Sequence, residues 1–385
     1  MKKEALFVSL LLLLNVLSYG QKNQTKLSSA MEIPMQAGHW SYESEQVEFI
    51  QHMGVQAMKT STGETPVILK NHTFKDGTIE FDVALLEGIF VTLYFRREDA
   101  EESECFYLRT YRAGNAQGWD AVQYASIIKG ITLWDLQGHY QSNATLHNEG
   151  WNHIKLVISG DQMLAYVNDL SEPALVIPKL EGNSSSGHLA VEGNAIFANM
   201  RIHADAVEGL SPKEGLDLTN NDARYLRDWM VSEPVEFDFG QEILNKDLPN
   251  DSSRWSRITA ERLGLINLTR IFGGSKSRDS RRLCWLKTSI QSNRTQTRQL
   301  NLGFSDEVWV ILNGQLLYVD KNYYANFIMK QPGGRCSVEN TMFELPLQEG
   351  KNELLIGVGN FFYGWGIIAR LDMVEGLGLS EHLAP

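Results

Sequence analysis

Short runs in which apolar and polar side chains alternate recur along most of the chain. Each run is bounded by Gly, Asp or Asn and is rich in β-branched and aromatic residues. A period of two is typical of β-strands with one buried face, and convincing amphipathic helices are absent from the pattern. The clearest runs span residues 77–84, 89–96, 105–109, 153–159, 163–167 and 196–202. The pattern predicts an all-β fold built from antiparallel sandwiches.

The strand pattern is interrupted over residues 207–221, where Gly, Pro and Asn are typical of a loop and indicate a linker. A second series of strand-like runs follows, and Asn313-Gly314 between two of these runs is a strong hairpin signal. The chain is also too long for a single hydrophobic core. We therefore expect two antiparallel β-sandwich (jelly-roll) domains in tandem.

The first 20 residues have the features of a signal peptide. Lys2 and Lys3 precede an apolar run over residues 6–17, and residues 18–20 form a small-residue cleavage region that ends at Gly20. The apolar run is too short to span a bilayer. We expect cleavage near Gly20 and a secreted or periplasmic protein.

Charge and cysteine content narrow the class of protein. The net charge of −12 argues against nucleic acid as the main partner. With only Cys105, Cys284 and Cys336, the fold cannot depend on a disulfide framework. Cys284 could pair with Cys336, although a small buried thiol at Cys284 is the simpler interpretation because it lies in an apolar run.

Familiar catalytic and metal-binding motifs are missing from the sequence. The nine His residues show no HExxH or closely paired spacing, and neither a Gly-x-Ser-x-Gly elbow nor a phosphate loop occurs. A structural Ca²⁺ ion would suit such a fold, but no EF-hand-like spacing of acidic residues supports it. We expect no metal site and no cofactor.

Three successive strands of the first half each have one face with charged or hydroxyl-bearing side chains. Alternation assigns to these faces Glu80 and Asp82, then Tyr94 and Arg96, then Tyr107 and Arg109. If the strands are neighbours, the faces merge into one surface, to which Gln123, Tyr124 and Trp134 would add. Planar polar groups and aromatic faces are what sugar recognition requires. The alternative is a solvated sheet face whose opposite charges pair across strands.

Several of these runs together resemble the concanavalin A-like lectin and glucanase group, which includes laminin-G-like modules. The resemblance covers residues 31–206 and is carried by residues 74–82, 95–96, 104–109, 120–124 and 150–157. It implies a β-sandwich whose concave sheet and rim loops hold a saccharide. The group contains lectins, glycosidases, lyases and adhesion modules, so the resemblance leaves the function open.

The second half of the chain resembles the galactose-binding-like jelly roll, a domain that commonly accompanies glycoside hydrolases. The resemblance spans residues 222–376 and is carried by residues 302–318, 345–356 and 364–366. A basic cluster lies in this half at Lys276, Arg278, Arg281 and Arg282. It could pair with uronate or sulfate groups of an acidic glycan, or it could be a solvated loop.

The leading hypothesis is a carbohydrate-binding protein for a poly- or oligosaccharide. One alternative is a glycoside hydrolase or polysaccharide lyase that uses Glu80, Asp82 or Glu104, although the next carboxylate after Asp82 is Glu87, which departs from the glucanase pattern. A second alternative is an extracellular module that binds protein.

Overall fold

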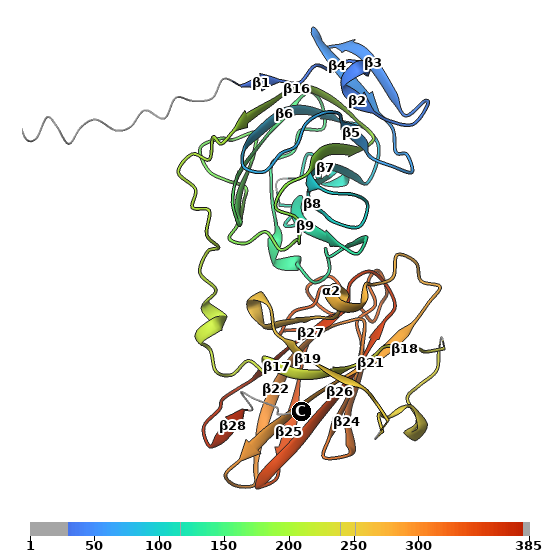
Figure 1. Cartoon of the computed structure of the whole chain (residues 1–385), viewed down its shortest axis with the longest axis vertical. Coiled ribbons are helices and arrows are strands. Elements are labelled where there is room, and N and C mark those ends of the chain that lie inside the picture. Colours follow the sequence, from blue (N-terminus) through green and yellow to red (C-terminus); the bar gives the residue numbers. More distant parts are fainter. Residues whose placement is uncertain (1–29, 116, 239, 251, 380–385) are drawn as a thin grey trace, which may run out of the picture.

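The computed structural model describes residues 30–379 except residues 116, 239 and 251 (Figure 1). The predicted all-β fold is confirmed: the strands form antiparallel sheets in two sandwiches, one above the other in Figure 1. Two sheets are built from strands between Met31 and Ala204, and two from strands between Asp228 and Leu379. The predicted signal peptide over residues 1–20 lies outside the described residues and stays a prediction.

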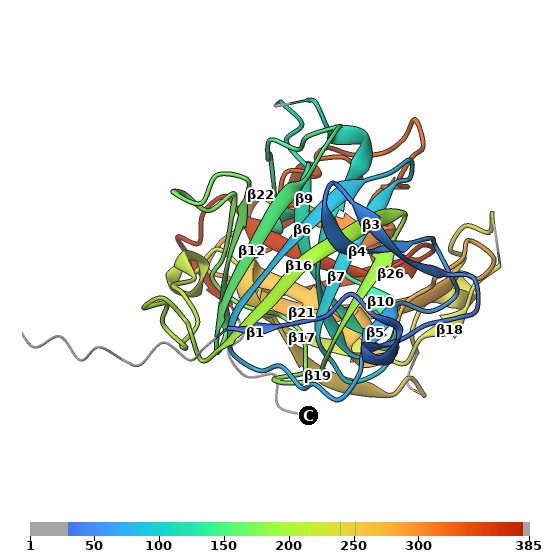
Figure 2. The same ribbon diagram turned by 90° about the horizontal axis from the view of Figure 1, so that it is seen from above.

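The first sandwich has an outer sheet and an inner sheet (Figure 2). The outer sheet runs in the order β14 (Leu175–Ile177), β13 (Gln162–Val167), β12 (Asn152–Ser159), β6 (Gly77–Leu85), β16 (Ala195–Ala204), β4 (Val55–Thr60) and β3 (Val47–His52), with β1 (Met31–Glu32) beside β16. The inner sheet runs in the order β10 (Ile131–Thr132), β9 (Val122–Ile128), β8 (Ser103–Arg109), β7 (Phe90–Arg97), β15 (His188–Gly193), β5 (Val67–Leu69) and β2 (Trp40–Ser41), with β11 (Gln141–Ser142) beside β9.

Alternation along the strands fills the core between these two sheets. Strand β6 buries Ile79 and Val83, while β7 buries Leu93 and Phe95 against them. The intervening polar side chains therefore point away from the core, to the outside of their own sheet. Which polar residues meet on one surface depends on the sheet to which each strand belongs.

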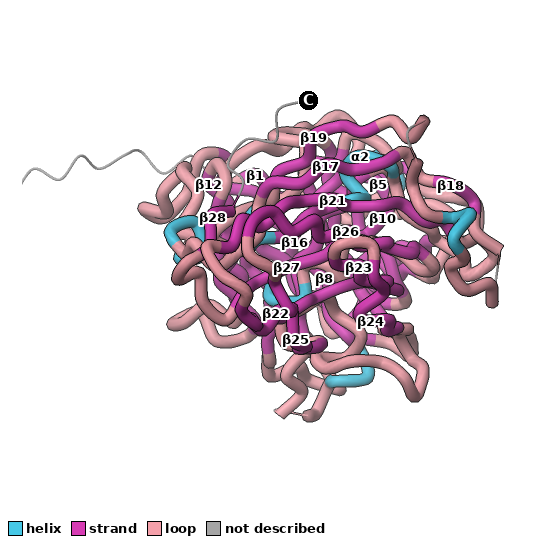
Figure 3. The backbone as a smooth tube through the Cα atoms, turned by 90° about the horizontal axis from the view of Figure 1, so that it is seen from below, coloured by secondary structure: helices cyan, strands magenta, loops and turns pink. Residues whose placement is uncertain are grey.

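The second sandwich is seen most directly from below (Figure 3). Its larger sheet runs in the order β19 (Trp255–Thr259), β17 (Asp228–Ser232), β21 (Arg282–Ser292), β26 (Gly350–Asn360), β23 (Glu307–Leu312) and β24 (Gln315–Lys321), with β18 (Val235–Glu236) and β28 (Leu377–Leu379) beside β21. The smaller sheet runs in the order β20 (Leu265–Asn267), β27 (Gly366–Leu371), β22 (Gln296–Ser305) and β25 (Thr341–Leu347).

The predicted hairpin at Asn313-Gly314 is confirmed. These two residues connect β23 and β24, with φ values of 52° and 79°. Positive φ at both central positions is the requirement of the type I′ turn that matches the twist of paired strands, and Asn-Gly satisfies it.

Helices contribute little to the fold. The α-helix among the described residues is α2 (Leu268–Phe272). Short 3₁₀ turns occur at Ala37–His39, Thr110–Arg112, Gly138–Tyr140, Leu218–Asn221, Asn245–Asp247 and Arg262–Gly264. Within the described ranges, no helix has the length and apolar character needed to cross a membrane.

All three cysteines are free and buried, which confirms the simpler interpretation of Cys284 as a buried thiol. Cys284 lies in the core of the second sandwich. Cys336 instead lies in a separate apolar cluster, shared by the two sandwiches.

The two sandwiches meet across that apolar cluster. Its buried members are Ile128, Ile131, Leu133 and Leu136 from the first sandwich and Leu265, Cys336 and Ile368 from the second. The backbone N–H of Cys336 also donates to the carbonyl of Asp135 at 2.9 Å. The contact brings the inner sheet of the first sandwich to face the second sandwich (Figure 1).

Candidate functional site

A cavity of about 670 Å³ lies where the inner sheet of the first sandwich meets loops of the second. The floor is the outward face of β7, β8 and β15. Among the residues that line it are Tyr94, Tyr107, Arg109, Trp134 and Glu192 of the first sandwich and Tyr324, Arg335, Phe362 and Tyr363 of the second. Four of these, namely Tyr94, Tyr107, Arg109 and Trp134, were predicted from the sequence.

Strand pairing explains why three of the predicted residues come together. Strands β7 and β8 are neighbours, with Thr92 opposite Tyr107 and Phe90 opposite Arg109. The Arg109 guanidinium carbon lies 5.2 Å from the centre of the Tyr107 ring. The side chains share the face opposite the core, as the alternation predicted.

Gln123 of β9 lies directly opposite Tyr107 of β8, so its side chain shares this face and orients two of its members. The Gln123 Oε1 atom accepts hydrogen bonds from the Tyr107 hydroxyl at 2.7 Å and from Arg109 Nη2 at 2.6 Å. Its Nε2 atom donates to the carbonyl of Trp134 at 2.9 Å. Gln123 is fully buried, so it does not contact a ligand itself but holds Tyr107 and Arg109 in position.

Replacing Gln123 with leucine is therefore expected to lower the free energy of unfolding by about 1–3 kcal/mol, because Tyr107 and Arg109 lose their shared acceptor. Tyr107→Phe is the matched comparison, since it removes one donor and leaves Gln123 bonded to Arg109. Urea unfolding of the three proteins checks this. Equal midpoints for wild type and Gln123→Leu would contradict the supporting role.

Aromatic side chains from both sandwiches form a wall of the cavity. The Trp134 ring makes edge contacts with Tyr324 and Tyr363, at centroid separations of 4.6 Å and 5.8 Å. The Arg335 guanidinium carbon lies 4.9 Å from the Trp134 ring centre. The second sandwich thus completes a surface that the first sandwich only begins.

Glu192 brings a carboxylate to the cavity. It lies on β15 opposite Thr92 of β7, and the Tyr94 hydroxyl donates a hydrogen bond to it. Burial, with the nearby charge of Glu192, raises the pKa of Tyr94, so this hydroxyl stays a donor. Sequence reasoning missed Glu192, although the alternation of residues 188–193 would have placed it outward.

Glu80 and Asp82 do not join this surface, and the predicted single patch is wrong in this respect. Strand β6 pairs with β12 and β16 of the outer sheet, so its polar face lies on the far side of the sandwich. There Asp82 contacts His153 Nδ1 at 2.7 Å and accepts from Asn199 at 2.7 Å. Burial acts to raise the pKa of Asp82, but these two hydrogen bonds outweigh it and the net pKa is lowered.

Arg96 also departs from the predicted face. Its φ of 48° interrupts the strand conformation, and the side chain is buried. The guanidinium donates to Asp76 Oδ1 and to the carbonyl of Gly160, both at 2.8 Å. The alternation rule fails here because it assumes extended backbone at every position.

Tyr124 and Glu104 point into the first sandwich, away from the cavity. Tyr124 neighbours Gln123 on β9 and therefore faces the core, where its hydroxyl donates to Glu104 Oε2 at 2.7 Å. Burial raises the pKa of Glu104 to about 8. Glu80 and Asp82 share the outer face of β6, whereas Glu104 is buried inside the first sandwich, so the three carboxylates do not form one site.

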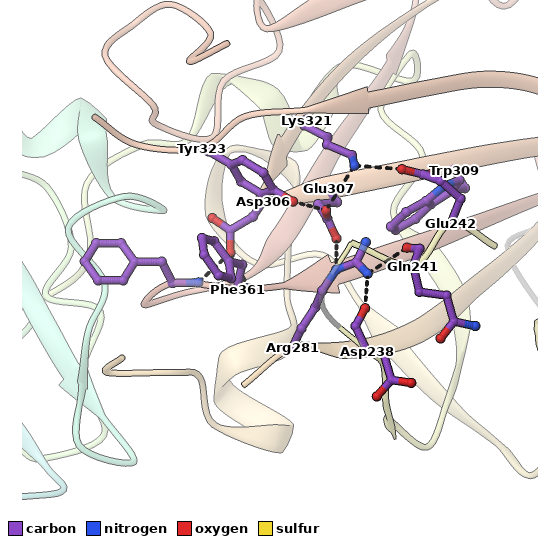
Figure 4. Close-up of polar contacts among 11 residues, drawn as sticks. Asp238, Gln241, Glu242, Arg281, Asp306, Glu307, Trp309, Lys321, Tyr323 and Phe361 are labelled. Carbon is purple, nitrogen blue, oxygen red and sulfur yellow. Dashed lines mark hydrogen bonds and ion pairs between the residues drawn. The ribbon is translucent and has the colours of Figure 1, made fainter. Parts of the chain in front are cut away.

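The basic cluster of the second sandwich does not form one anion site. Arg281 is buried against Glu307, with 2.7 Å between Nε and Oε2 (Figure 4). Arg282 donates to the carbonyl of Phe272 at 3.0 Å. Lys276 and Arg278 are exposed. Arg278 nevertheless donates to the carbonyl of Tyr324 at 3.0 Å, so three of the four cations have partners within the protein.

Within the part of the chain that the structure describes, no group of three or more His, Cys, Asp or Glu side chains is arranged to hold a metal ion. The cavity residues that could engage a ligand are hydroxyls, guanidinium groups, aromatic rings and the carboxylate of Glu192. Its described lining contains no second carboxylate at the 5 Å or so that a retaining glycosidase needs.

Comparison with protein families and with curated proteins found no match for this chain. Among solved structures, carbohydrate-binding module CBM66 from Bacillus subtilis is 16% identical, with 46% of this chain and 95% of that chain covered and a TM-score of 0.29. A Bacillus subtilis protein of unknown function with a galectin-like fold is 10% identical over 45% and 94%, with a TM-score of 0.33. A putative glycosyl hydrolase from Parabacteroides distasonis is 12% identical over 45% and 99%, with a TM-score of 0.32. Likenesses this weak assign no function to this chain.

Proposed function

We propose that this protein binds a poly- or oligosaccharide in the cavity between its two sandwiches. The observation that carries the proposal is the convergence of aromatic rings from both sandwiches with guanidinium, hydroxyl and carboxylate groups around one cavity. Its volume of about 670 Å³ falls within the usual range of ligand pockets.

The chemistry of the lining suits a pyranose. Rings such as Trp134 and Tyr324 can pack against the C–H face of a sugar, and Arg109 and Glu192 can exchange directional hydrogen bonds with its hydroxyls. Because Gln123 holds Tyr107 and Arg109 in fixed positions, little ordering of these side chains is needed when the ligand enters.

Replacing Trp134 with alanine is expected to weaken saccharide binding about 30-fold or more, the loss typical of a central aromatic contact of about 2 kcal/mol. A glycan array selects the ligand, and titration calorimetry with the best hit measures the affinity. Trp151→Ala is the matched control because Trp151 packs on the outer sheet, on the far side of the first sandwich. An unchanged affinity in Trp134→Ala would contradict the proposed site.

A product assay on every array hit separates binding from catalysis. Binding alone predicts retained oligosaccharide without new reducing or unsaturated ends. Product that disappears in Glu192→Gln would replace the binding proposal with an enzymatic one, since Glu192 is the carboxylate in the described lining.

A further inference from the structure

Arg335 is a buried cation on the cavity wall for which the described residues supply no ion-pair partner. The side chain is 4% exposed. Its Nη1 atom donates to the carbonyl of Gly333, and its Nη2 atom to Gln141 Oε1 at 3.3 Å. The Nε atom is buried without a hydrogen-bond partner. A buried charge without an ion-pair partner destabilises the folded protein unless another group, such as a bound anion, neutralises it.

The surrounding charges increase the positive potential at this point. Arg109 also lines the cavity, and it lies close enough to disfavour the charge on Arg335. Asp120 is the carboxylate whose charge favours the charged form of Arg335. It already forms ion pairs with two other arginines: its Oδ1 lies 2.7 Å from Arg112 Nε and its Oδ2 lies 3.7 Å from Arg109 Nε. Three guanidinium groups therefore share one carboxylate here.

Aromatic contacts hold the Arg335 side chain in place. Its guanidinium carbon lies 4.9 Å from the Trp134 ring centre, 5.6 Å from that of Tyr324 and 5.8 Å from that of Trp119. Rings packed on a guanidinium limit its motion and leave the in-plane N–H groups as donors, the geometry that matches carboxylate and sulfate oxygens.

We propose that Arg335, together with Arg109, recognises an anionic substituent, a carboxylate or a sulfate ester, on the bound saccharide. The ligand class is thus an acidic glycan, and the second sandwich contributes the selective residue. This inference rests on the proposed saccharide site. Arg335 lies in the segment between β24 and β25 and lines the cavity. Arg278 is exposed and contacts the carbonyl of Tyr324 in the same segment, but it does not belong to the cavity lining.

The test compares charged and neutral versions of the same glycan on the full-length protein. Polygalacturonate against its fully methyl-esterified form probes the carboxylate, and chondroitin sulfate against its desulfated form probes the sulfate. Titration calorimetry should give at least tenfold tighter binding of one charged form than of its neutral partner, as expected for charge-assisted hydrogen bonds. Arg335→Gln should weaken binding of the charged form at least tenfold more than binding of its neutral partner, so that the preference for the charged form disappears.

Arg201→Gln is the matched control, since Arg201 is an exposed arginine of the outer sheet. A charge preference that survives in Arg335→Gln overturns the inference, as does equal wild-type affinity for charged and neutral forms, which would leave the saccharide proposal standing. Absence of binding to any glycan overturns both.

If Arg335→Gln does not fold, Arg335→Lys replaces it. This variant should reduce the preference for the charged form at least threefold, because lysine lacks the bidentate fork of arginine. An undiminished preference in Arg335→Lys would count against the inference.

Discussion

Replacing Arg281 with methionine is expected to lower the free energy of unfolding of the second sandwich by about 3–5 kcal/mol. Arg281 and Glu307 form an ion pair whose side chains are 2% and 0% exposed. Removing the cation leaves a carboxylate in the interior, and the loss of one partner of such a pair costs more than the pair itself contributes.

The contacts around the pair explain why Arg281 is difficult to replace (Figure 4). Its Nη1 atom donates to the carbonyls of Asp238 and Gln241, at 2.7 Å and 2.8 Å. Its guanidinium carbon lies 4.3 Å from the centre of the Phe237 ring. Methionine keeps part of the apolar packing but none of these donors, so two carbonyls lose their donor and Glu307 loses its buried cation.

Urea unfolding of Arg281→Met, Glu307→Met and the double variant measures the coupling between the two residues. We expect the double variant to be more stable than either single variant, because it buries no unpaired charge. Arg201→Met, which removes an exposed pair with Glu32, is the control and should change stability by about 1 kcal/mol or less. A loss of under 1 kcal/mol in Arg281→Met would show that Tyr323 and Lys321, the other partners of Glu307, suffice.

The local features of this fold could be predicted from the sequence because they depend on neighbouring residues. Alternation identified the strands and the outward positions of Tyr107 and Arg109, and it failed at Arg96, where the backbone is not extended. The Asn313-Gly314 turn was also found, since a type I′ turn is specified by two residues.

The arrangement of the strands could not be predicted in the same way. Strand β6 pairs with β12 and β16, both of which lie far along the chain, and the polar face of β6 is therefore on the opposite side from that of β7. The alternation of apolar and polar residues in β6 would be the same whichever of the two sheets contained the strand, so it does not show on which side of the sandwich Glu80 and Asp82 lie. Register and sheet membership depend on long-range contacts that a single sequence does not display.

The cavity residues that come from the second sandwich also could not be predicted from local sequence patterns. Tyr324 and Arg335 belong to the segment between β24 and β25, which contains no strand, so neither alternation nor helical periodicity assigns their side chains a direction. They reach the cavity because the apolar cluster around Leu133 and Ile368 fixes the two sandwiches against each other.

A pair of buried carboxyl groups at the same interface makes a second strong prediction. The Ser305 hydroxyl lies 3.3 Å from Asp135 Oδ2 of the first sandwich and 3.2 Å from Asp306 Oδ1 of the second. The backbone N–H groups of Phe361 and Phe362 donate to Asp306 Oδ2 at 2.6 Å and 2.8 Å. Burial raises the pKa of Asp306 to about 7, and burial together with Asp306 raises that of Asp135 well above its usual range.

The sign of the pH effect follows from the raised pKa values. Below about pH 4 these aspartates are protonated in both the folded and the unfolded chain. Between about pH 4 and 7 the unfolded chain ionises while folded Asp306 holds its proton, so each pH unit destabilises the fold by about 1.4 kcal/mol. Above about pH 7 both states are ionised at Asp306, and the full destabilisation of about 4 kcal/mol persists.

Asp306→Asn should remove this dependence, because asparagine accepts the two backbone hydrogen bonds without ionising. We expect the variant to unfold at higher urea concentration than wild type at pH 8 and at nearly the same concentration at pH 4. Asp279→Asn, at an exposed aspartate, is the control and should track wild type at every pH. Because Asp306 also raises the pKa of Asp135, the difference from wild type reports Asp306 together with the part of the Asp135 titration that depends on it. A difference that does not grow between pH 4 and pH 8 would contradict a protonated carboxyl at the interface.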